Sequence, residues 1–448
     1  MLAERGKPVA KVTTRRNAAR GRGGQPARGP APGAEGPGRL MQLEINAVGG
    51  QGDGIAPGPV FVPLTLAGEQ VSAEVRGDRG ELQAVLRPSP ERVAPPCSHY
   101  GDCGGCALQH WDAGPYLAWK AEQIRITLGR ERLETEILAP FATPPGSRRR
   151  LALHARKAGQ GAQIGFKARR SWRLAAIDSC TVADARLVAA FPALARLAAP
   201  FLEHPKSAPT LHVTLSDTGL DIDITGVERR SGGLSADARM VAAEAASAGD
   251  FARVTMAGEI VYQARQPIVR LGPATVALPA GAFLQATREA EDAMADFAVD
   301  AAVGARGIAD LFCGAGTFTF RLAAVAPVLA ADAAGPAVRA LTSAIAGAPG
   351  LKAIRAETRD LDRRPVLAEE LKKIDVALFD PPRAGAAEQA AQLARSGVAR
   401  VIGVSCNPAT FVRDARTLVD AGFRLERVLP VDQFLWSPHI ELVGVFSR

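Results

Sequence analysis

The stretch GIADLFCGAGTFTFRLA, residues 307–323, has the pattern that decides the fold of the C-terminal part of the chain. An apolar run of strand length ends in a Gly-x-Gly turn, and the residues after the turn are typical of a helix. Glycines at such a turn allow the backbone to approach a ligand closely. From about residue 281 onward, further strand–turn–helix units follow, and they predict a parallel α/β sheet.

The glycine turn predicts a cofactor site at one edge of this sheet. Its candidate residues are Phe312, Gly314 and Gly316. Asp332 ends the next strand, in VLAADAAG, at a workable distance for holding ribose hydroxyls. A turn of this kind fits a dinucleotide or S-adenosylmethionine, but it also occurs where glycines serve only packing. The turn alone therefore does not select between these interpretations.

Three later segments add reactive side chains. IDVALFDPPRAG places Asp380 at the C-terminal end of a strand, where open α/β sheets bind ligands. Cys406 follows the buried run VARVIGV and precedes Asn407-Pro408, the expected start of a helix. Glu441 stands at the head of the last strand, in WSPHIELVGVF. We expect these side chains to line one crevice with the glycine turn.

Cys406 has two interpretations. A helix N-terminus presents N–H groups and the positive end of the helix dipole, which favour the reactive thiolate over the thiol. An isolated cysteine is, however, often only a small buried hydrophobic residue. The neighbouring motifs favour the reactive interpretation.

The Cys-rich stretch PCSHYGDCGGCALQHW, residues 96–111, predicts a metal site. Its cysteines are Cys97, Cys103 and Cys106. Convergent thiolates in a reducing compartment suggest metal rather than disulfides, and their softness leaves zinc and iron–sulfur as candidates. Cys180, in IDSCTV, is the available fourth cysteine, whereas His99 or His110 could instead complete a zinc site. The spacing does not separate these two metals.

Chain length and the distribution of charge limit the number of domains and identify an unusual N-terminal segment. A chain of 448 residues with 47% hydrophobic residues is expected to form two to four domains. The net charge is +8, and residues 1–40 contribute nine Lys/Arg and two Asp/Glu, a surplus of +7. This Gly/Pro/Arg-rich tail is expected to be disordered, either adding affinity for RNA or being dispensable. No stretch has the length of a membrane span, and we expect a cytoplasmic protein.

The sequence pattern divides residues 41–270 into a β-rich segment, a helix and an α+β region. Residues 41–95 alternate short β-rich runs with Gly-rich turns, which predicts a small closed barrel. YLAWKAEQIRITLGR predicts a helix. Residues 146–270 predict an α+β region with strands at RLALHARK and TLHVTLSDTGLDIDITG.

Taken in order, CSHYGDCGGCALQHW, DLFCGAGTFTF, DPPRAG, SCNPATFVRD and PHIE resemble the motifs of the RNA uracil-5-methyltransferases. The likeness is to the iron–sulfur branch that acts on 23S ribosomal RNA, and it runs from about Met41 to the C-terminus. It implies a multidomain α/β fold. The parts would be a disordered tail (1–40), a TRAM barrel of the oligonucleotide-binding type (41–95), an α+β iron–sulfur domain (96–275) and a Rossmann-like class I methyltransferase domain (276–448).

The resemblance also implies cofactors and ligands. S-adenosylmethionine would bind near Gln285, and Cys97, Cys103, Cys106 and Cys180 would hold a 4Fe-4S cluster. The partner would be RNA, and we expect a monomer. The family usually has Glu where this chain has Asp332. The tRNA branch generally lacks the barrel and the cluster, which favours ribosomal RNA and leaves tRNA as the alternative substrate.

The implied chemistry assigns a role to each reactive side chain. Cys406 would add to carbon-6 of uracil and thereby make carbon-5 nucleophilic. Glu441 would remove the carbon-5 proton after methyl transfer. Asp380 would orient the uracil or contact the cofactor.

Two rival functions are a radical enzyme and a non-catalytic RNA-binding iron–sulfur protein. The spacing differs from the Cys-x3-Cys-x2-Cys of radical enzymes, and the presence of Cys406 and Glu441 disfavours the second rival.

Overall fold

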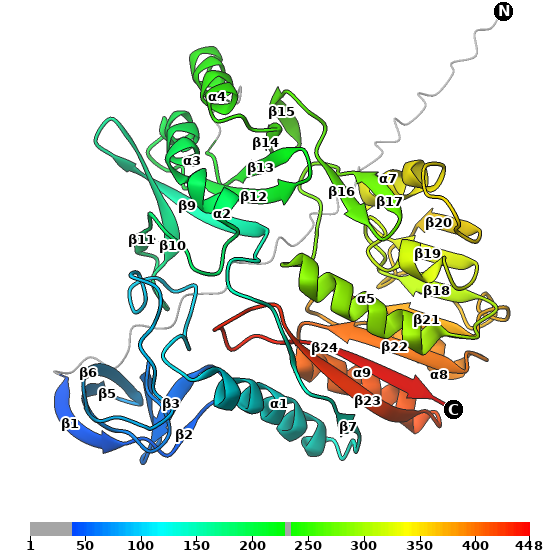
Figure 1. Cartoon of the computed structure of the whole chain (residues 1–448), viewed down its shortest axis with the longest axis horizontal. Coiled ribbons are helices and arrows are strands. Elements are labelled where there is room, and N and C mark those ends of the chain that lie inside the picture. The colour runs from blue at the N-terminus through cyan, green and yellow to red at the C-terminus, as the bar shows by residue number, and fades with distance from the viewer. Residues whose placement is uncertain (1–37, 229–233) are drawn as a thin grey trace, which may run out of the picture.

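The computed structural model describes residues 38–228 and 234–448 (Figure 1). The expectation of a disordered tail concerns residues that lie almost entirely outside these ranges. At its end the tail is shorter than expected, because Arg39 and Leu40 already pair with Val75 and Glu74. No helix within the described ranges is long and apolar enough to cross a membrane.

The N-terminal part is a six-stranded sheet in the order β1-β5-β6-β4-β3-β2. Its strands are β1 (Arg39–Glu44), β2 (Ala47–Val48), β3 (Asp53–Ala56), β4 (Val60–Pro63), β5 (Gln70–Arg76) and β6 (Arg79–Arg87). Alternate side chains such as Val60, Val62 and Val71 form its small core, as expected for strands with one buried face. Strands thus lie where the alternating pattern predicts them, and the TRAM assignment stays a prediction.

The central part is a seven-stranded sheet in the order β11-β10-β9-β12-β13-β14-β15. Its strands are β9 (Arg150–Ala158), β10 (Gly161–Lys167), β11 (Leu174–Ala176), β12 (Thr210–Ser216), β13 (Gly219–Thr225), β14 (Arg253–Met256) and β15 (Glu259–Gln263). Its helices are α2 (Ala185–Ala189), α3 (Phe191–Ala198), the 3-10 helix η1 (Ala199–Leu202) and α4 (Ala236–Ala248). The α+β prediction for this region is confirmed, and β9, β12 and β13 coincide with the predicted strands. A hairpin of β16 (Ile268–Leu271) and β17 (Ala274–Ala277) follows.

The C-terminal part is built on a nine-stranded sheet, in the order β20-β19-β18-β21-β22-β24-β23-β7 with β8 beside β23 (Figure 1). Its strands are β7 (Glu136–Ile137), β8 (Phe141–Ala142), β18 (Ile308–Leu311), β19 (Val328–Asp332), β20 (Ile354–Thr358), β21 (Val376–Phe379), β22 (Arg400–Ser405), β23 (Arg424–Asp432) and β24 (Glu441–Ser447). Its helices are α5 (Arg288–Ala302), α6 (Thr319–Leu322), α7 (Gly335–Ile345), α8 (Ala387–Arg395) and α9 (Pro408–Asp420). Hydrophobic clusters fill both faces of the sheet.

The predicted parallel sheet is confirmed from β18 to β22 but not at the end of the chain. All four residues of β18 and of β21 are buried, as expected for parallel strands covered on both faces. β24 runs antiparallel to both β22 and β23. Because only the short loop 433–440 joins β23 to β24, they form a hairpin and cannot be parallel, which would require a crossover.

Helix α1 (Ala113–Arg130) joins the N-terminal and C-terminal parts, and the helix predicted there is confirmed. Asp112 caps it by accepting a hydrogen bond from the Gly114 N–H at 3.0 Å. Ile124 and Leu128 pack into the core beneath the C-terminal sheet, and β7 and β8 then join that sheet at its edge. The chain between the Cys-rich stretch and the central sheet is therefore part of the C-terminal layer (Figure 1).

Candidate active site

The residues predicted to line one crevice do meet at one edge of the C-terminal sheet. β19, β18, β21 and β22 are parallel neighbours, so their C-terminal ends lie side by side. These ends carry Asp332, the glycine turn, Asp380 and Cys406. Ser405 pairs with Leu442 of antiparallel β24, which places Glu441 at the same edge.

The glycine turn is held by Asp332. The Gly314 N–H donates to Asp332 Oδ2 at 2.9 Å, and the Ala334 N–H donates to Oδ1 at 2.7 Å. Gly316 has φ +102°, and a Cβ there would lie 2.5 Å from the Phe320 ring, so only glycine fits. Phe312 also has a positive φ, of 64°. Asp332 thus shapes the turn, while its carboxylate keeps capacity to accept from a ribose hydroxyl.

A hydrogen-bonded chain of side chains crosses the site from Asp380 to Glu441. Gln285 Nε2 donates to Asp380 Oδ2 at 3.0 Å, and Gln433 Nε2 donates both to Gln285 Oε1 at 2.9 Å and to Glu441 Oε2 at 2.7 Å. The Ala286 N–H donates to Gln433 Oε1 at 2.9 Å, which fixes the orientation of that amide. Gln433 was not predicted, since only the pairing of β23 with β24 brings it beside Glu441.

Glu441 is buried and Asp380 is half-buried, and the pKa values of both carboxyls are raised. Burial is the main cause for the pKa of Glu441, and the nearby charge of Asp380 raises it further. Burial likewise raises the pKa of Asp380, against the hydrogen bond from Gln285. Neighbouring Asp310, at the end of β18, is fully buried, and burial raises its pKa to about 7. Raised pKa values clustered in this way are typical of functional sites.

Cys406 lies where the sequence predicts it, between β22 and α9, and it is half-buried. Asn407 caps the helix by accepting from the Ala409 N–H at 3.2 Å. The expectation of an acidified thiol is not supported by its surroundings. Burial raises the pKa of Cys406, and the carboxyls of Glu441 and Asp380 raise it further, while Arg383 lowers it. Arg383 is therefore the cation that favours the thiolate here.

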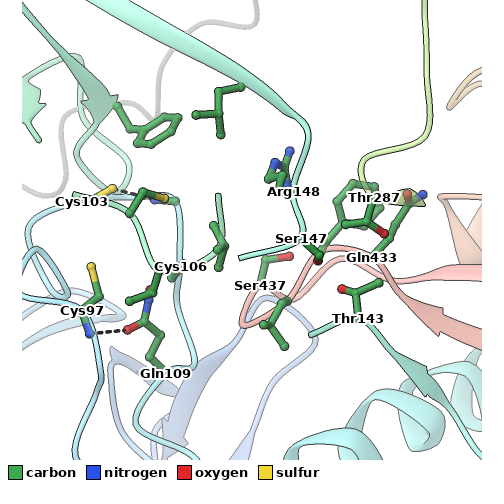
Figure 2. Close-up of a pocket in the computed structure, with 18 of the residues that line it drawn as sticks. Cys97, Cys103, Cys106, Gln109, Thr143, Ser147, Arg148, Thr287, Gln433 and Ser437 are labelled. Atoms are coloured by element: carbon green, nitrogen blue, oxygen red, sulfur yellow. Dashed lines mark hydrogen bonds between the residues drawn. The ribbon is translucent and has the colours of Figure 1, made fainter. Parts of the chain in front are cut away.

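One cavity of about 480 Å³ joins Cys406 to the Cys-rich stretch. Cys97, Cys103, Cys106 and Cys180 all line it, and none of the four forms a disulfide. Figure 2 shows Cys97, Cys103 and Cys106 on one side of this cavity and Thr287 and Gln433 across from them. The four cysteines suggested as ligands are thus brought together from two distant segments of the chain.

Four cysteines without a disulfide are a soft donor set that suits zinc or an iron–sulfur cluster. In the ranges that the structure describes, no three His, Cys, Asp or Glu side chains come close enough to hold one metal ion. Thiolates that bind different irons of one cluster need not converge on a single point. His99 Nε2 lies 2.7 Å from Asp178 Oδ1, and the buried His110 contacts the Tyr100 hydroxyl through Nδ1. Each histidine considered for zinc thus has one ring nitrogen engaged, which leaves its other nitrogen and does not exclude it as a ligand.

The Cys-rich stretch holds the loop 433–440 that leads to Glu441. The Ala107 and Leu108 N–H groups donate to the Trp436 carbonyl at 2.8 and 3.0 Å. From α1, the Tyr116 hydroxyl donates to Asp432 Oδ2 at 2.7 Å and accepts from the Trp436 N–H at 2.7 Å.

Lys120 holds the same loop from inside. Its side chain is 1% exposed and forms an ion pair with Asp432, which is 0% exposed. Its Nζ also donates to the His439 carbonyl at 2.7 Å, two residues before Glu441. Burial lowers the pKa of Lys120 to about 8. Sequence inspection did not identify this lysine, because its partners lie more than 300 residues away.

Comparison with known proteins identifies the family. A family model described as tRNA (Uracil-5-)-methyltransferase matches residues 275–448. An uncharacterized RNA methyltransferase of Caulobacter vibrioides is 68% identical over 415 residues, covering 91% of this chain and 100% of that protein. The 23S rRNA (uracil(1939)-C(5))-methyltransferase of Chromohalobacter salexigens is 31% identical, covering 91% of this chain and 89% of that protein.

A solved structure agrees with this assignment at the level of the fold. The Pyrococcus abyssi tRNA (uracil-54, C5)-methyltransferase, in complex with S-adenosyl-L-homocysteine, superposes with a TM-score of 0.68 at 23% sequence identity. The match covers 91% of this chain and 99% of that one. The chain therefore belongs to the family of S-adenosylmethionine-dependent RNA uracil-5-methyltransferases.

Proposed function

We propose that the protein methylates carbon-5 of a specific uridine in 23S ribosomal RNA through a covalent adduct with Cys406. The observation that carries this proposal is the placement of Cys406 and Glu441 on adjacent strands, at the edge where the glycine turn lies. A nucleophile and a base at neighbouring strand ends suit a reaction that needs both.

The reaction follows from these two side chains. Cys406 adds as a thiolate to carbon-6 of the uracil, and the electron pair moves to carbon-5. S-adenosylmethionine supplies the methyl group that carbon-5 takes up. Glu441 then accepts the carbon-5 proton, and release of the Cys406 thiolate restores the carbon-5–carbon-6 double bond. Burial and Asp380 raise the pKa of Glu441, which makes it a stronger base for this proton.

The remaining side chains position the reactants. Phe312, Gly314, Gly316 and Asp332 would hold the cofactor at the turn. Gln285 and Asp380 hydrogen-bond each other between the turn and Glu441, so they can contact either the cofactor or the polar edge of the uracil. The target base has to leave its stack to enter such a pocket.

Ribosomal RNA is favoured over tRNA by the relative of Chromohalobacter salexigens, which aligns with nearly the whole chain. We also propose the accompanying organisation: a TRAM domain at 41–95, an iron–sulfur domain at 96–275 and a methyltransferase domain at 276–448, in a cytoplasmic monomer. The test is to incubate the protein with methyl-labelled S-adenosylmethionine and either transcribed 23S rRNA or transcribed tRNA. Labelled 5-methyluridine in 23S rRNA alone supports the proposal. Label found only in tRNA would show that the substrate is tRNA and not 23S rRNA.

A 4Fe-4S cluster would be held by Cys97, Cys103, Cys106 and Cys180. Its role here would be to cross-link two segments of the chain by coordination. Protein purified without oxygen should contain about four irons and four sulfides per chain. Cys180→Ser should lower the iron content, whereas Cys313→Ser, at a buried cysteine outside the cavity, should leave it unchanged. One zinc per chain and no iron would contradict the cluster.

A further inference from the structure

A second hollow, of about 710 Å³, opens on the central part of the molecule, and we call it the Trp172 groove. The cationic side chains in its lining are Arg156, Lys157, Lys167 and Arg173, and they lie with Trp172 among neutral polar and apolar residues. None of the described residues that line it is Asp or Glu. The groove therefore presents positive charge around one aromatic ring.

Trp172 is the most exposed large hydrophobic residue reported for the described chain, at 71%. The Lys167 ammonium lies 3.8 Å from the centroid of its ring, which is close enough for a cation–π interaction. Lys167 covers one part of the indole, and most of the ring stays open to solvent. A ring held in this way can stack with a planar partner such as a nucleobase.

Most of the positive charge in the groove is not neutralised by protein carboxylates. Arg173 forms an ion pair with Asp102, outside the groove. Arg156 donates to the neutral Gln163 amide, at 3.2 Å from Nε and 3.0 Å from Nη2. Within the described ranges, Arg156, Lys157 and Lys167 take part in no salt bridge with the groove's other residues. These cations are free to contact phosphates.

The Trp172 groove and the catalytic cavity are separate hollows that are lined in part by residues of the same two strands. Ala152 of β9 and Phe166 of β10 line the cavity, while Arg156 and Lys167 line the groove. Four residues along a strand span about 13 Å. An RNA strand that places one base in the cavity therefore brings its neighbouring nucleotides within reach of the groove.

We propose that the Trp172 groove binds a single-stranded or looped segment of the substrate RNA beside the target nucleotide, with Trp172 stacking on a base and Arg156 and Lys167 contacting phosphates. This inference rests on the proposed function, because it takes RNA as the substrate. Stacking on an aromatic ring combined with a basic track is the common way of holding single strands without sequence readout.

The test measures binding of the full-length protein to a fluorescent 16-nucleotide oligouridylate over a range of salt concentrations. Trp172→Ala should weaken binding by about 5- to 150-fold, the range for losing one stacked base. Arg156→Gln combined with Lys167→Gln should reduce the slope of log affinity against log salt by about 1.4, which is two phosphate contacts. Binding of S-adenosylmethionine and the melting temperature should not change.

Matched controls come from the same part of the molecule. Ile260→Ala removes a hydrophobic side chain that is 58% exposed, and Arg239→Gln removes an arginine whose partner is Glu259. Both controls should bind the oligonucleotide like the wild type. Unchanged RNA affinity and an unchanged salt slope in the groove variants would overturn the inference. The same result is expected if the groove binds an acidic protein segment instead of RNA, so that occupant would also be incompatible with the inference. If instead the wild type methylates neither 23S rRNA nor tRNA, it is the proposed function that fails.

Discussion

The edge of the C-terminal sheet and the Cys-rich stretch line the same cavity, yet they are built in opposite ways. At the sheet edge, strand ends place Asp380 and Cys406, and the strand pairing fixes their order. The chain from Cys97 to His110 contains no helix and no extended strand. It is positioned by distant contacts, such as those from Ala107 and Leu108 to Trp436.

This difference shows how the two halves of the cavity depend on each other. The sheet edge keeps its geometry through buried parallel strands, which are among the most stable parts of a fold. The loop 433–440, by contrast, is held by Tyr116, Lys120 and the Cys-rich stretch. Since this loop joins β23 to β24, contacts from the N-terminal half of the chain add to the strand pairing that places the proposed base.

The largest effect is expected from the nucleophile at the sheet edge. Cys406→Ala should lower turnover by at least about 10⁴-fold, because the other thiol at that edge, Cys313, is buried in the glycine turn. Calorimetry should show nearly unchanged binding of S-adenosylmethionine, since the thiol acts on RNA. The control is Cys313→Ala, which removes the buried cysteine of the glycine turn and should retain most activity. Substantial turnover by Cys406→Ala would exclude this thiol from the reaction.

Glu441→Gln should separate addition from elimination. The amide keeps the shape of the side chain and can still accept from Gln433, but it cannot take the carbon-5 proton. We expect a methylated RNA–protein adduct that survives denaturing gel electrophoresis, with turnover reduced by about 10²- to 10⁴-fold. The control is Glu426→Gln, near the start of β23 and at the opposite end of that strand from the site, and it should accumulate no adduct. Normal turnover by Glu441→Gln would require another base.

The attachment of the loop 433–440 can be broken at Lys120. Lys120→Met leaves Asp432 as an unpaired buried charge, which typically costs about 3–5 kcal/mol. The melting temperature should fall by roughly 10 °C. Lys120→Met with Asp432→Leu should recover most of the loss, because well-packed apolar residues often replace a buried pair without penalty. Arg125→Ala, which breaks an exposed pair with Glu122 on the same helix, should cost less than about 0.5 kcal/mol.

Thermal denaturation followed by circular dichroism measures these stabilities. An unchanged melting temperature in Lys120→Met would show that the loop does not depend on this ion pair. The double variant also tests the proposed dependence of Glu441 on α1. If stability returns but activity does not, the pair positions the base as well as stabilising the fold.

The same contrast explains which features could be predicted from the sequence. The glycine turn, Asp380 and Cys406 belong to strand–turn–helix units, whose local periodicity indicates both the fold and the side of the sheet. Their meeting at one edge follows from parallel neighbours and could be predicted without knowing a single tertiary contact. The roles of these residues stay predictions.

Gln433, Lys120 and the antiparallel hairpin could not be predicted in this way. Gln433 gains its position only from the register of β23 with β24, and Lys120 from an ion pair with a residue 312 positions away. The pKa of Cys406 was expected to fall because of the helix N-terminus. Burial raises it, and the carboxyls that raise it further belong to two other strands, so both effects depend on tertiary structure.

The smallest effect concerns this charge balance between Asp380, Glu441 and Cys406. The charge of Asp380 raises the pKa values of both Glu441 and Cys406. Asp380→Asn removes that charge, while the asparagine carbonyl can still accept the hydrogen bond from Gln285. The pKa values of both Glu441 and Cys406 should therefore fall. Because Glu441 and Cys406 act in their deprotonated forms, the acidic limb of kcat/KM against pH should move to lower pH. Asp380 also faces the reactants, so the maximum rate should drop, and the informative readout is the position of the limb.

Glu388→Gln, at an exposed carboxyl on α8, should leave the limb in place. A limb that stays fixed in Asp380→Asn would mean that the titrating groups of the reaction are not those next to Asp380.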